Sequence, residues 1–478
     1  MDIREGLTFD DVLLVPKFSD VSSRSETDLS TQLSRNISIN IPLISANMDT
    51  VTESSMAVTI AREGGIGIIH RFLTIQEEVN EVLKVKRSGS VMIENPYSIN
   101  PEQTIQNAFS IMNEKQVSGL LVVDSNSKLV GILTGRDILF EPPNCSKLVK
   151  ELMTKDVVTA KLGIDLEEAK EVLKKNRIEK LPIIDDNNLV KGLITCQDIS
   201  NLEKYPNASK DNKGRPIVGA AVGVKGDFME RTEALIDAGT DTIVVDIAHG
   251  HSENAINTVK NIKKAFSDCE IIAGNVATAK GTEDLIKAGV DAVKVGVGSG
   301  SICITRVITG SGVPQLTAVL DCAKVGKEYN IPIISDGGTR NSGDATKALA
   351  AGASSIMVGG ILGGTDETPG TTITKNNKRF KIYRGMASLG ASMGRKTRET
   401  GAFELTDDIN DYVAEGVDAM VPYKGSVTDI ITQITGGIRS GLSYCGAHNI
   451  KQMHENAEFI KISGAGFAES QPHDVDIM

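Results

Sequence analysis

The chain has 478 residues, 40% hydrophobic and 24% charged, proportions typical of a globular protein with two or more domains. Its formal net charge of −11 argues against a nucleic-acid-binding surface, and no apolar stretch is long enough to cross a bilayer. The six cysteines form no C-x-x-C pair and the first residues lack the apolar core of a secretion signal, so we expect a cytoplasmic protein with reduced thiols.

Strand and helix patterns alternate from the beginning of the chain. Residues 41–51 are typical of a strand that ends in a polar turn, residues 54–63 have helical spacing, and residues 64–70 are typical of a second strand. This alternation predicts a parallel α/β fold.

An internal repeat interrupts this pattern between residue 88 and about residue 202. Each copy has a helix, two strands and a Thr-x-x-Asp sequence that opens a further helix, at Thr134 and at Thr195. The repeat resembles a pair of CBS domains, residues 88–145 and 146–204, inserted into another domain. The resemblance implies contacts with an adenine or guanine nucleotide. The alternative is that each threonine only caps its helix.

The alternation resumes after a polar, turn-rich linker at residues 205–216. Together with strands near Ile44 and Ile68, the later strands make eight strand–helix units, which predicts a TIM (β/α)8 barrel formed by residues 1–87 and 205–478. A doubly wound open sheet is the alternative, but the chain has no Gly-x-Gly-x-x-Gly turn near its start. The later strands are predicted at residues 218–222, 242–246, 270–273, 292–295, 332–335 and 355–358.

The regular pattern stops at Lys375. Residues 376–381 predict a hairpin, residues 385–401 an irregular segment rich in Gly, Ser and Arg, and residues 429–441 a final helix. Long irregular segments in compact proteins are usually lids, binding loops or disorder. We expect a mobile flap at about residues 390–420.

One cysteine, Cys303, stands among glycines directly after the strand at 292–295. Glycine permits conformations that bring backbone N–H groups close to a ligand, and a thiolate at such a strand end is a nucleophile. The alternative is a flexible loop with an inert, buried cysteine. The neighbouring residues are Gly296, Gly298, Gly300, Ser301 and Thr305.

Residues 298–306, GSGSICITR, resemble the active-site loop of the IMP dehydrogenase / GMP reductase family, and the resemblance covers nearly the whole chain. It implies that Cys303 attacks C2 of IMP, that hydride passes to NAD, and that water hydrolyses the resulting thioimidate to XMP, the committed step of guanine nucleotide synthesis. It also implies a homotetramer with a monovalent cation (K⁺). The implied cation ligands are the carbonyls of Gly298, Gly300 and Cys303, completed by Glu469, Ser470 and Gln471 of a neighbouring subunit.

Two glycine pairs after late strands, Gly337–Gly338 and Gly359–Gly360, predict a phosphate site together with Ser301. Their alternative role is in turns only. Asp336 suits ribose hydroxyls, because a carboxylate repels phosphate. The resemblance implies the same assignment and adds nucleotide contacts at Tyr383, Arg384, Gly385, Met386, Ala387 and Glu415. For the dinucleotide it implies Asp246, whose alternative role is helix capping, and we add Gly296, Val297 and Gly298.

The chain departs from the dehydrogenase pattern where water is activated. The expected Arg-Tyr pair is absent from residues 394–401, where Arg398 is the nearest candidate. Arginine is a poor base, so we favour a relay from Glu415 through Thr305; the alternative is that Glu415 caps a turn and Thr305 packs. At position 47 the asparagine resembles the GMP reductase pattern, whereas at position 389 the leucine resembles the dehydrogenase pattern. A GMP reductase using NADPH and a non-catalytic nucleotide-sensing protein are therefore the alternative functions.

Overall fold

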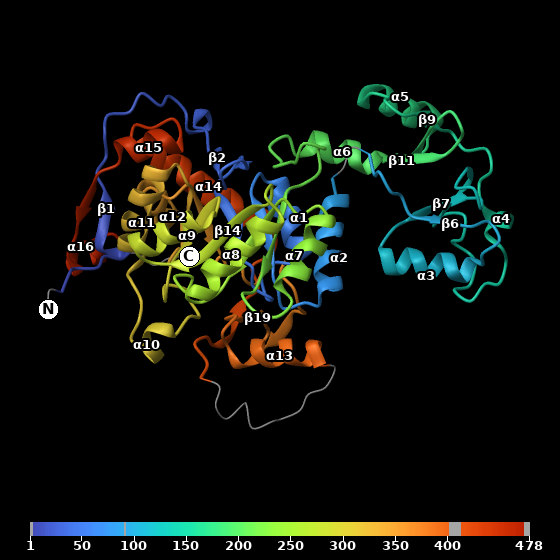
Figure 1. Ribbon diagram of the computed structural model, residues 1–478. Coiled ribbons are helices and arrows are strands. Elements are labelled where there is room, and N and C mark those ends of the chain that lie inside the picture. Colours follow the sequence, from blue (N-terminus) through green and yellow to red (C-terminus); the bar gives the residue numbers. More distant parts are fainter. Residues whose placement is uncertain (1–2, 90–91, 401–412, 473–478) are drawn as a thin grey trace. The chain divides into compact units, whose positions relative to one another are not determined.

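The computed structural model describes residues 3–89, 92–400 and 413–472, without the side chains of residues 201–202 and 395–400. The chain divides into two compact units (Figure 1). The first consists of Met1–Lys86, Asn207–Asp211 and Pro216–Met478, and the second of Arg87–Pro206 and Asn212–Arg215.

Eight parallel strands close into a barrel in the first unit, which confirms the predicted TIM barrel. Around the barrel the strands follow the order β12, β13, β14, β15, β16, β17, β4 and β5. Their bounds are β4 Leu43–Ser45, β5 Ile66–Ile69, β12 Val218–Val222, β13 Thr242–Asp246, β14 Glu270–Val276, β15 Ala292–Val295, β16 Ile333–Asp336 and β17 Ser355–Val358. The helices of the barrel are α1 Ser54–Arg62, α2 Ile75–Arg87, α7 Phe228–Asp237, α8 Glu253–Ala265, α9 Ala279–Ala288, α11 Gln315–Tyr329, α12 Ser342–Ala350 and α14 Val427–Tyr444, with the short α10 Thr305–Thr309 after β15.

The barrel encloses a packed interior to which alternate strand positions contribute. Val244, Ala292 and Ile334 belong to this interior cluster, whereas their neighbours such as Val245 and Val293 pack with the surrounding helices. Successive side chains of a strand point to opposite faces, so the residue two positions after an interior residue faces the interior again. On β13, β15 and β16 these next residues are polar, and they form the layer at the carboxyl ends of the strands.

Additional elements follow and flank the barrel. A three-stranded antiparallel sheet has the order β18, β19, β20, and the N-terminal β1 pairs with β21 near the C-terminus. The bounds are η1 Phe9–Asp11, β1 Val12–Leu14, η2 Arg24–Glu26, β2 Thr31–Gln32, β3 Ser38–Ile39, β18 Ile373–Lys375, β19 Lys378–Arg384, α13 Leu389–Thr400, β20 Asp418–Pro422, α15 Ile450–Asn456, β21 Phe459–Lys461 and α16 Gly464–Glu469.

Two expectations for this region were wrong. The segment predicted to be irregular contains helix α13, which starts after Ser388, whose hydroxyl accepts the N–H of Ala391 at 3.2 Å. The helix predicted to be last is followed by α15 and α16, whose N-terminal N–H groups are capped by Asn449 and Ser463. Residues 401–412, the middle of the expected flap, lie outside the described residues.

The second unit contains two three-stranded sheets with the same order of pairing, β6–β7–β8 and β9–β10–β11. Thr195 and Asp198 open helix α6 and bond each other, with 2.5 Å between Oγ1 and Oδ2. The corresponding helix after Thr134 is absent: residues 135–140 form turns, and the prolines at 142 and 143 block helix continuation. The elements are β6 Ser98–Ile99, α3 Ile105–Lys115, β7 Gly119–Val123, β8 Leu129–Thr134, α4 Val149–Leu152, β9 Ala160–Lys161, α5 Leu166–Asn176, β10 Lys180–Ile184, β11 Val190–Thr195 and α6 Cys196–Lys204.

Among the described residues, no helix combines the length and the apolarity that a bilayer crossing requires.

Candidate active site

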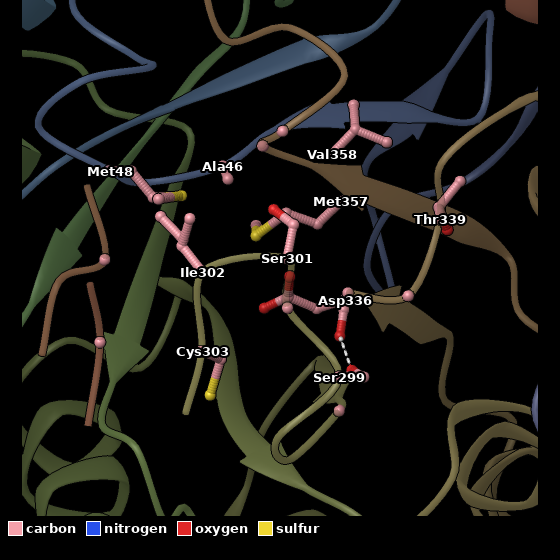
Figure 2. A pocket seen from close by; sticks show the side chains of 18 of the residues that line it. Ala46, Met48, Ser299, Ser301, Ile302, Cys303, Asp336, Thr339, Met357 and Val358 are labelled. Carbon is pink, nitrogen blue, oxygen red and sulfur yellow. Dashed lines mark hydrogen bonds between the residues drawn. The ribbon is translucent and has the colours of Figure 1, made fainter. Parts of the chain in front are cut away.

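A cavity of about 1070 Å³ opens at the carboxyl ends of the barrel strands. This volume lies slightly above the usual range for small-molecule sites, about 300–1,000 Å³, so it has room for a nucleotide and part of a second ligand. Figure 2 shows Ser301, Cys303 and Asp336 around this space. The predicted site residues that line it are Asp246, Gly296, Val297, Gly298, Gly300, Ser301, Cys303, Thr305, Asp336, Gly337, Gly338, Gly359, Gly360, Tyr383, Gly385, Met386, Ala387 and Glu415.

Other predicted residues lie elsewhere. Arg384 does not line the cavity, because its Nε donates to Asp49 Oδ2 at 2.8 Å. Arg398 belongs to helix α13, but its side chain is outside the described residues. Glu469, Ser470 and Gln471, at the end of α16, are not cavity-lining residues of this chain.

The nucleophile candidate lies in a row of three polar side chains. Cys303 Sγ is 3.1 Å from Thr305 Oγ1, and Thr305 Oγ1 donates to Glu415 Oε2 at 2.8 Å. Because the Thr305 hydroxyl donates its hydrogen bond to Glu415, its oxygen is free to accept a proton from the Cys303 thiol or from a water molecule beside it. The arrangement can therefore move a proton from the reacting centre to a carboxylate.

Backbone pairing creates this row. Ile304 N–H donates to Glu415 O at 2.8 Å, and the N–H of Val417 donates to Ile302 O at 3.1 Å, so the two segments run side by side around Cys303. On its other side, Glu415 N–H donates to Ala387 O at 3.1 Å. The cysteine loop, Glu415 and the segment that begins at Gly385 thus form one wall of the cavity.

The side chain of Arg306 bonds to backbone carbonyls at both ends of the cysteine loop. Its Nη2 donates to Val313 O at 2.6 Å and to Val297 O at 3.4 Å, which joins the two ends of the loop. Gly298 has a φ of +78°, and a Cβ there would lie 2.5 Å from Arg306 Cγ. A glycine is therefore required at this position both by conformation and by space.

The glycine pairs lie at the end of the cavity predicted to bind phosphate. Gly338 N–H is already bonded to Ser299 O at 3.0 Å, whereas the N–H groups of Gly359 and Gly360 have no protein acceptor in the part of the chain that the structure describes. Ser301 Oγ lies 3.4 Å from the hydroxyl of Tyr383, and burial raises the pKa of that tyrosine. Two free amides and two hydroxyls form a neutral set of hydrogen-bond donors for an anion.

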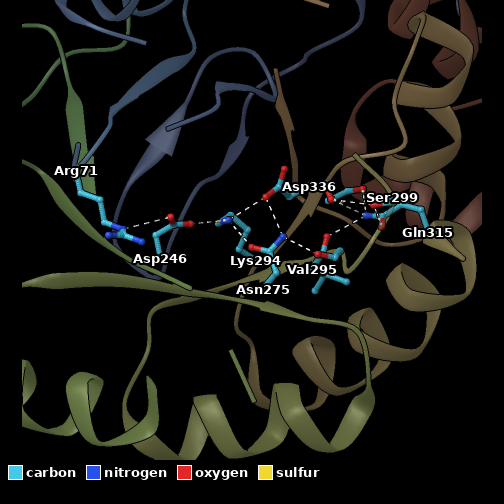
Figure 3. Close-up of polar contacts among 10 residues, drawn as sticks. Arg71, Asp246, Asn275, Lys294, Val295, Ser299, Gln315 and Asp336 are labelled. Carbon is cyan, nitrogen blue, oxygen red and sulfur yellow. Dashed lines mark hydrogen bonds and ion pairs between the residues drawn. The ribbon is translucent and has the colours of Figure 1, made fainter. Parts of the chain in front are cut away.

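A buried lysine that the motif analysis missed lies between the two predicted carboxylates. Lys294 contacts both Asp336 and Asp246, and Asn275 donates to Asp336 Oδ2 at 3.0 Å (Figure 3). A charged residue within an apolar, fully buried strand was the signal in the sequence.

No cluster of three or more His, Cys, Asp or Glu side chains suited to a metal ion occurs among the described residues.

Comparisons with known proteins show which family the chain belongs to. Residues 6–473 match the family described as the IMP dehydrogenase / GMP reductase domain. The chain is 75% identical over 478 residues to inosine-5'-monophosphate dehydrogenase of Nitrosopumilus maritimus, covering 100% of both chains, and 48% identical over 477 residues to the Bacillus subtilis enzyme of that name, covering 99% of this chain and 96% of the relative. The crystal structure of a GMP reductase variant from Trypanosoma brucei in complex with guanosine 5'-monophosphate aligns with a TM-score of 0.92 at 45% identity, covering 99% of each chain.

The fold and the cavity define a TIM-barrel enzyme, since active sites of this fold lie at the carboxyl ends of the strands. Because the family match and the relatives extend over nearly the whole chain, this protein belongs to the IMP dehydrogenase / GMP reductase family and is an oxidoreductase.

Proposed function

We propose that the protein oxidises IMP to XMP, with NAD as the hydride acceptor and Cys303 as the nucleophile. The observation that carries this proposal is the row Cys303–Thr305–Glu415 at the wall of a nucleotide-sized cavity. The 75% identity to a dehydrogenase of this name supports the direction of the reaction.

The described side chains divide the cavity by chemistry. Ser301, Tyr383 and the N–H groups of Gly359 and Gly360 bind the phosphate of IMP, and Asp336 accepts hydrogen bonds from the ribose hydroxyls. Met386 and Ala387 lie beside the base. Asp246 accepts from NAD, which lies next to the segment formed by Gly296, Val297 and Gly298.

The reaction proceeds in two halves. The Cys303 thiolate forms a bond to C2 of IMP, and the C2 hydrogen leaves with its electron pair as hydride. NAD supplies this hydride acceptor when bound. The product is a thioimidate between Cys303 and the purine, which water must hydrolyse at C2 to release XMP and the free thiol.

We assign the activation of that water to Thr305 and Glu415. The hydroxyl of Thr305 takes a proton from the water as it passes its own proton to Glu415, over the 2.8 Å bond between them.

Further features of the proposal concern the assembly. Carbonyl groups of Gly298, Gly300 and Cys303 are the type of ligand that binds K⁺. Glu469, Ser470 and Gln471 of a neighbouring subunit would complete the site in a homotetramer. The inserted unit is a CBS pair that binds a purine nucleotide, and the six free cysteines suit a cytoplasmic enzyme.

Reduction of GMP with NADPH is the second candidate. The aligned GMP reductase structure and Asn47, which lines the cavity, favour it. Incubation of the purified protein with IMP plus NAD, or with GMP plus NADPH, distinguishes the two by nicotinamide absorbance. We expect NADH formation in the first mixture; NADPH consumption in the second alone would support the reductase, and no change in either would support a non-catalytic nucleotide sensor.

Replacing the nucleophile tests the covalent mechanism. Cys303→Ala should abolish NADH formation and leave the binding of IMP, measured by calorimetry, largely intact, because the phosphate and ribose contacts remain. Substantial residual turnover in this variant would refute a role for Cys303 as the nucleophile.

A further inference from the structure

Lys294 lies inside the barrel, at its carboxyl end. On β15, Ala292 faces the interior and Val293 faces the helices, so Lys294 faces the interior again. Its side chain is only 4% exposed. A buried ammonium group is strongly unfavourable unless it is paired, so its partners indicate what it does.

The partners of Lys294 come from β16 on one side of β15 and from β13 and β14 on the other. Its Nζ lies 2.9 Å from Asp336 Oδ2 on β16 and 3.5 Å from Asp246 Oδ1 on β13, and it also contacts the side-chain oxygen of Asn275. Arg71, after β5, extends the row with its Nε 3.7 Å from Asp246 Oδ2. Figure 3 shows the four charged residues, alternating in sign, across the mouth of the barrel.

This alternation keeps the groups charged. Burial alone would raise the pKa of Asp246, but Lys294 and Arg71 hold it below its ordinary value. Burial alone would lower the pKa of Lys294, but Asp336 and Asp246 raise it. One ammonium group therefore serves two carboxylates at neutral pH.

The strand between Lys294 and Asp246 leaves room for their contact. Gly274 on β14 pairs with Asp246 on one side and Lys294 on the other. A Cβ at Gly274 would lie 2.8 Å from Lys294 Cβ and 2.3 Å from its carbonyl oxygen. The absence of a side chain at this position allows Lys294 to reach across β14.

The contacts also orient Asp336. Lys294 and Asn275 both donate to its Oδ2, and within the described residues no protein group donates to its Oδ1. We propose that Lys294 is a positioning residue: by holding Asp336 and Asp246 with a single charge, it links the nucleotide half of the cavity to the dinucleotide half. This inference rests on the proposed function, which assigns Asp336 to the ribose of IMP and Asp246 to NAD.

Removal of the ammonium group should make binding of IMP dependent on pH. Asp336 faces Lys294 and Tyr383, while Asp246 faces Lys294 and Arg71. Without Lys294, Asp336 and Asp246 lose the cation that they share, so the two neighbouring carboxylates should hold a proton more readily as the pH falls. The carboxylate that accepts the ribose hydroxyls is then lost as the pH falls.

The experiment measures IMP affinity by calorimetry in the absence of NAD. In Lys294→Met we expect affinity to fall at least about tenfold, the effect of removing one partner of a buried ion pair, and to fall further from about pH 8 to about pH 6. Lys294→Arg, which keeps the charge, should stay closer to the wild type and bind independently of pH. In the Asp246→Asn background, Lys294→Met should weaken IMP binding much less, because one carboxylate no longer repels the other.

An equal loss at every pH and in both backgrounds would overturn the inference and leave Lys294 with a packing role. If Lys294→Met does not fold, as judged by circular dichroism, the IMP affinity of the double variant Lys294→Met/Asp246→Asn is compared with that of Asp246→Asn. A double variant that binds IMP more than about tenfold more weakly than Asp246→Asn contradicts the inference. A wild-type protein that does not bind IMP would instead refute the proposed function.

Discussion

The hydroxyl of Thr305 donates to the carboxylate of Glu415 across 2.8 Å, although 110 positions separate the two residues in the chain. The bond exists because residues 302–304 pair with residues 415–417. It joins the loop that holds the nucleophile to the last part of the expected flap. The hydroxyl is thereby one proton transfer from Cys303, and the carboxylate is two.

The relay predicts a specific kinetic defect in Glu415→Gln. The first turnover should still release NADH in a fast burst, because hydride transfer precedes hydrolysis. The steady-state rate should fall by at least about 100-fold, the usual contribution of a positioned general base. Rapid-mixing absorbance measures both phases, with Glu415→Asp as a variant that retains the carboxylate. A burst followed by slow turnover in Arg398→Ala, with normal turnover in Glu415→Gln, would assign the base to the arginine instead.

The cysteine loop should tolerate a methyl group at one glycine and not at another. Gly298 and Gly310 both have left-handed φ angles, +78° and +70°, but only a Cβ at Gly298 would collide with Arg306. Gly310→Ala should be destabilised only by the left-handed backbone conformation, by about 1–2 kcal/mol. Gly298→Ala should in addition displace the loop and lower kcat by more than about tenfold. Equal kcat values in the two variants would show that Arg306 does not support the loop.

The inserted unit should be dispensable for the chemistry. The chain leaves the barrel unit after Lys86 and returns at Asn207, and Lys86 Nζ lies 3.0 Å from Asp211 Oδ2, so the two cut ends are close. A variant in which residues 87–206 are replaced by a short Gly-Ser linker should retain most of the kcat for IMP. Loss of all activity in a variant with native circular dichroism would mean that the insert contributes to the active site.

A buried carboxyl outside the cavity makes stability depend on pH. Burial raises the pKa of Glu78 to about 8, although Arg231 Nη1 lies 2.5 Å from it, and Asp227 also pairs with that arginine at 2.7 Å. The folded state therefore holds a proton that the unfolded chain releases near its ordinary pKa of 4.5. This contribution to stability is complete below that value and is lost as the pH rises through about 8.

Glu78→Gln provides the comparison, because glutamine is uncharged throughout. Between about pH 5 and 8 the free energy of unfolding of the wild type should decrease relative to the variant, by up to about 1.4 kcal/mol per pH unit. Urea denaturation at several pH values measures the difference. Parallel curves for the two proteins would show that Glu78 is ionised in the folded state.

The barrel could be predicted largely from the sequence. Buried parallel strands are short apolar runs bounded by turns, and the predicted bounds of β12, β13, β15 and β17 agree with the structure. The nucleophile loop could also be predicted, because its glycines and Cys303 are adjacent in the chain. Helix α13 was missed since glycine and serine disfavour helices, and packing overrides such local preferences.

Contacts between distant segments depended on the tertiary structure. The sequence offered Arg398, Glu415 and Thr305 as groups for activating water, but only the pairing of two loops brings Glu415 to Thr305. The pairing of Lys294 with Asp246 and Asp336 likewise depends on how neighbouring strands are placed in register around a closed barrel. Local preferences specify strands and turns, whereas these ion pairs join side chains of β13, β15 and β16. Only the order and register of the strands bring those side chains together at one end of the barrel.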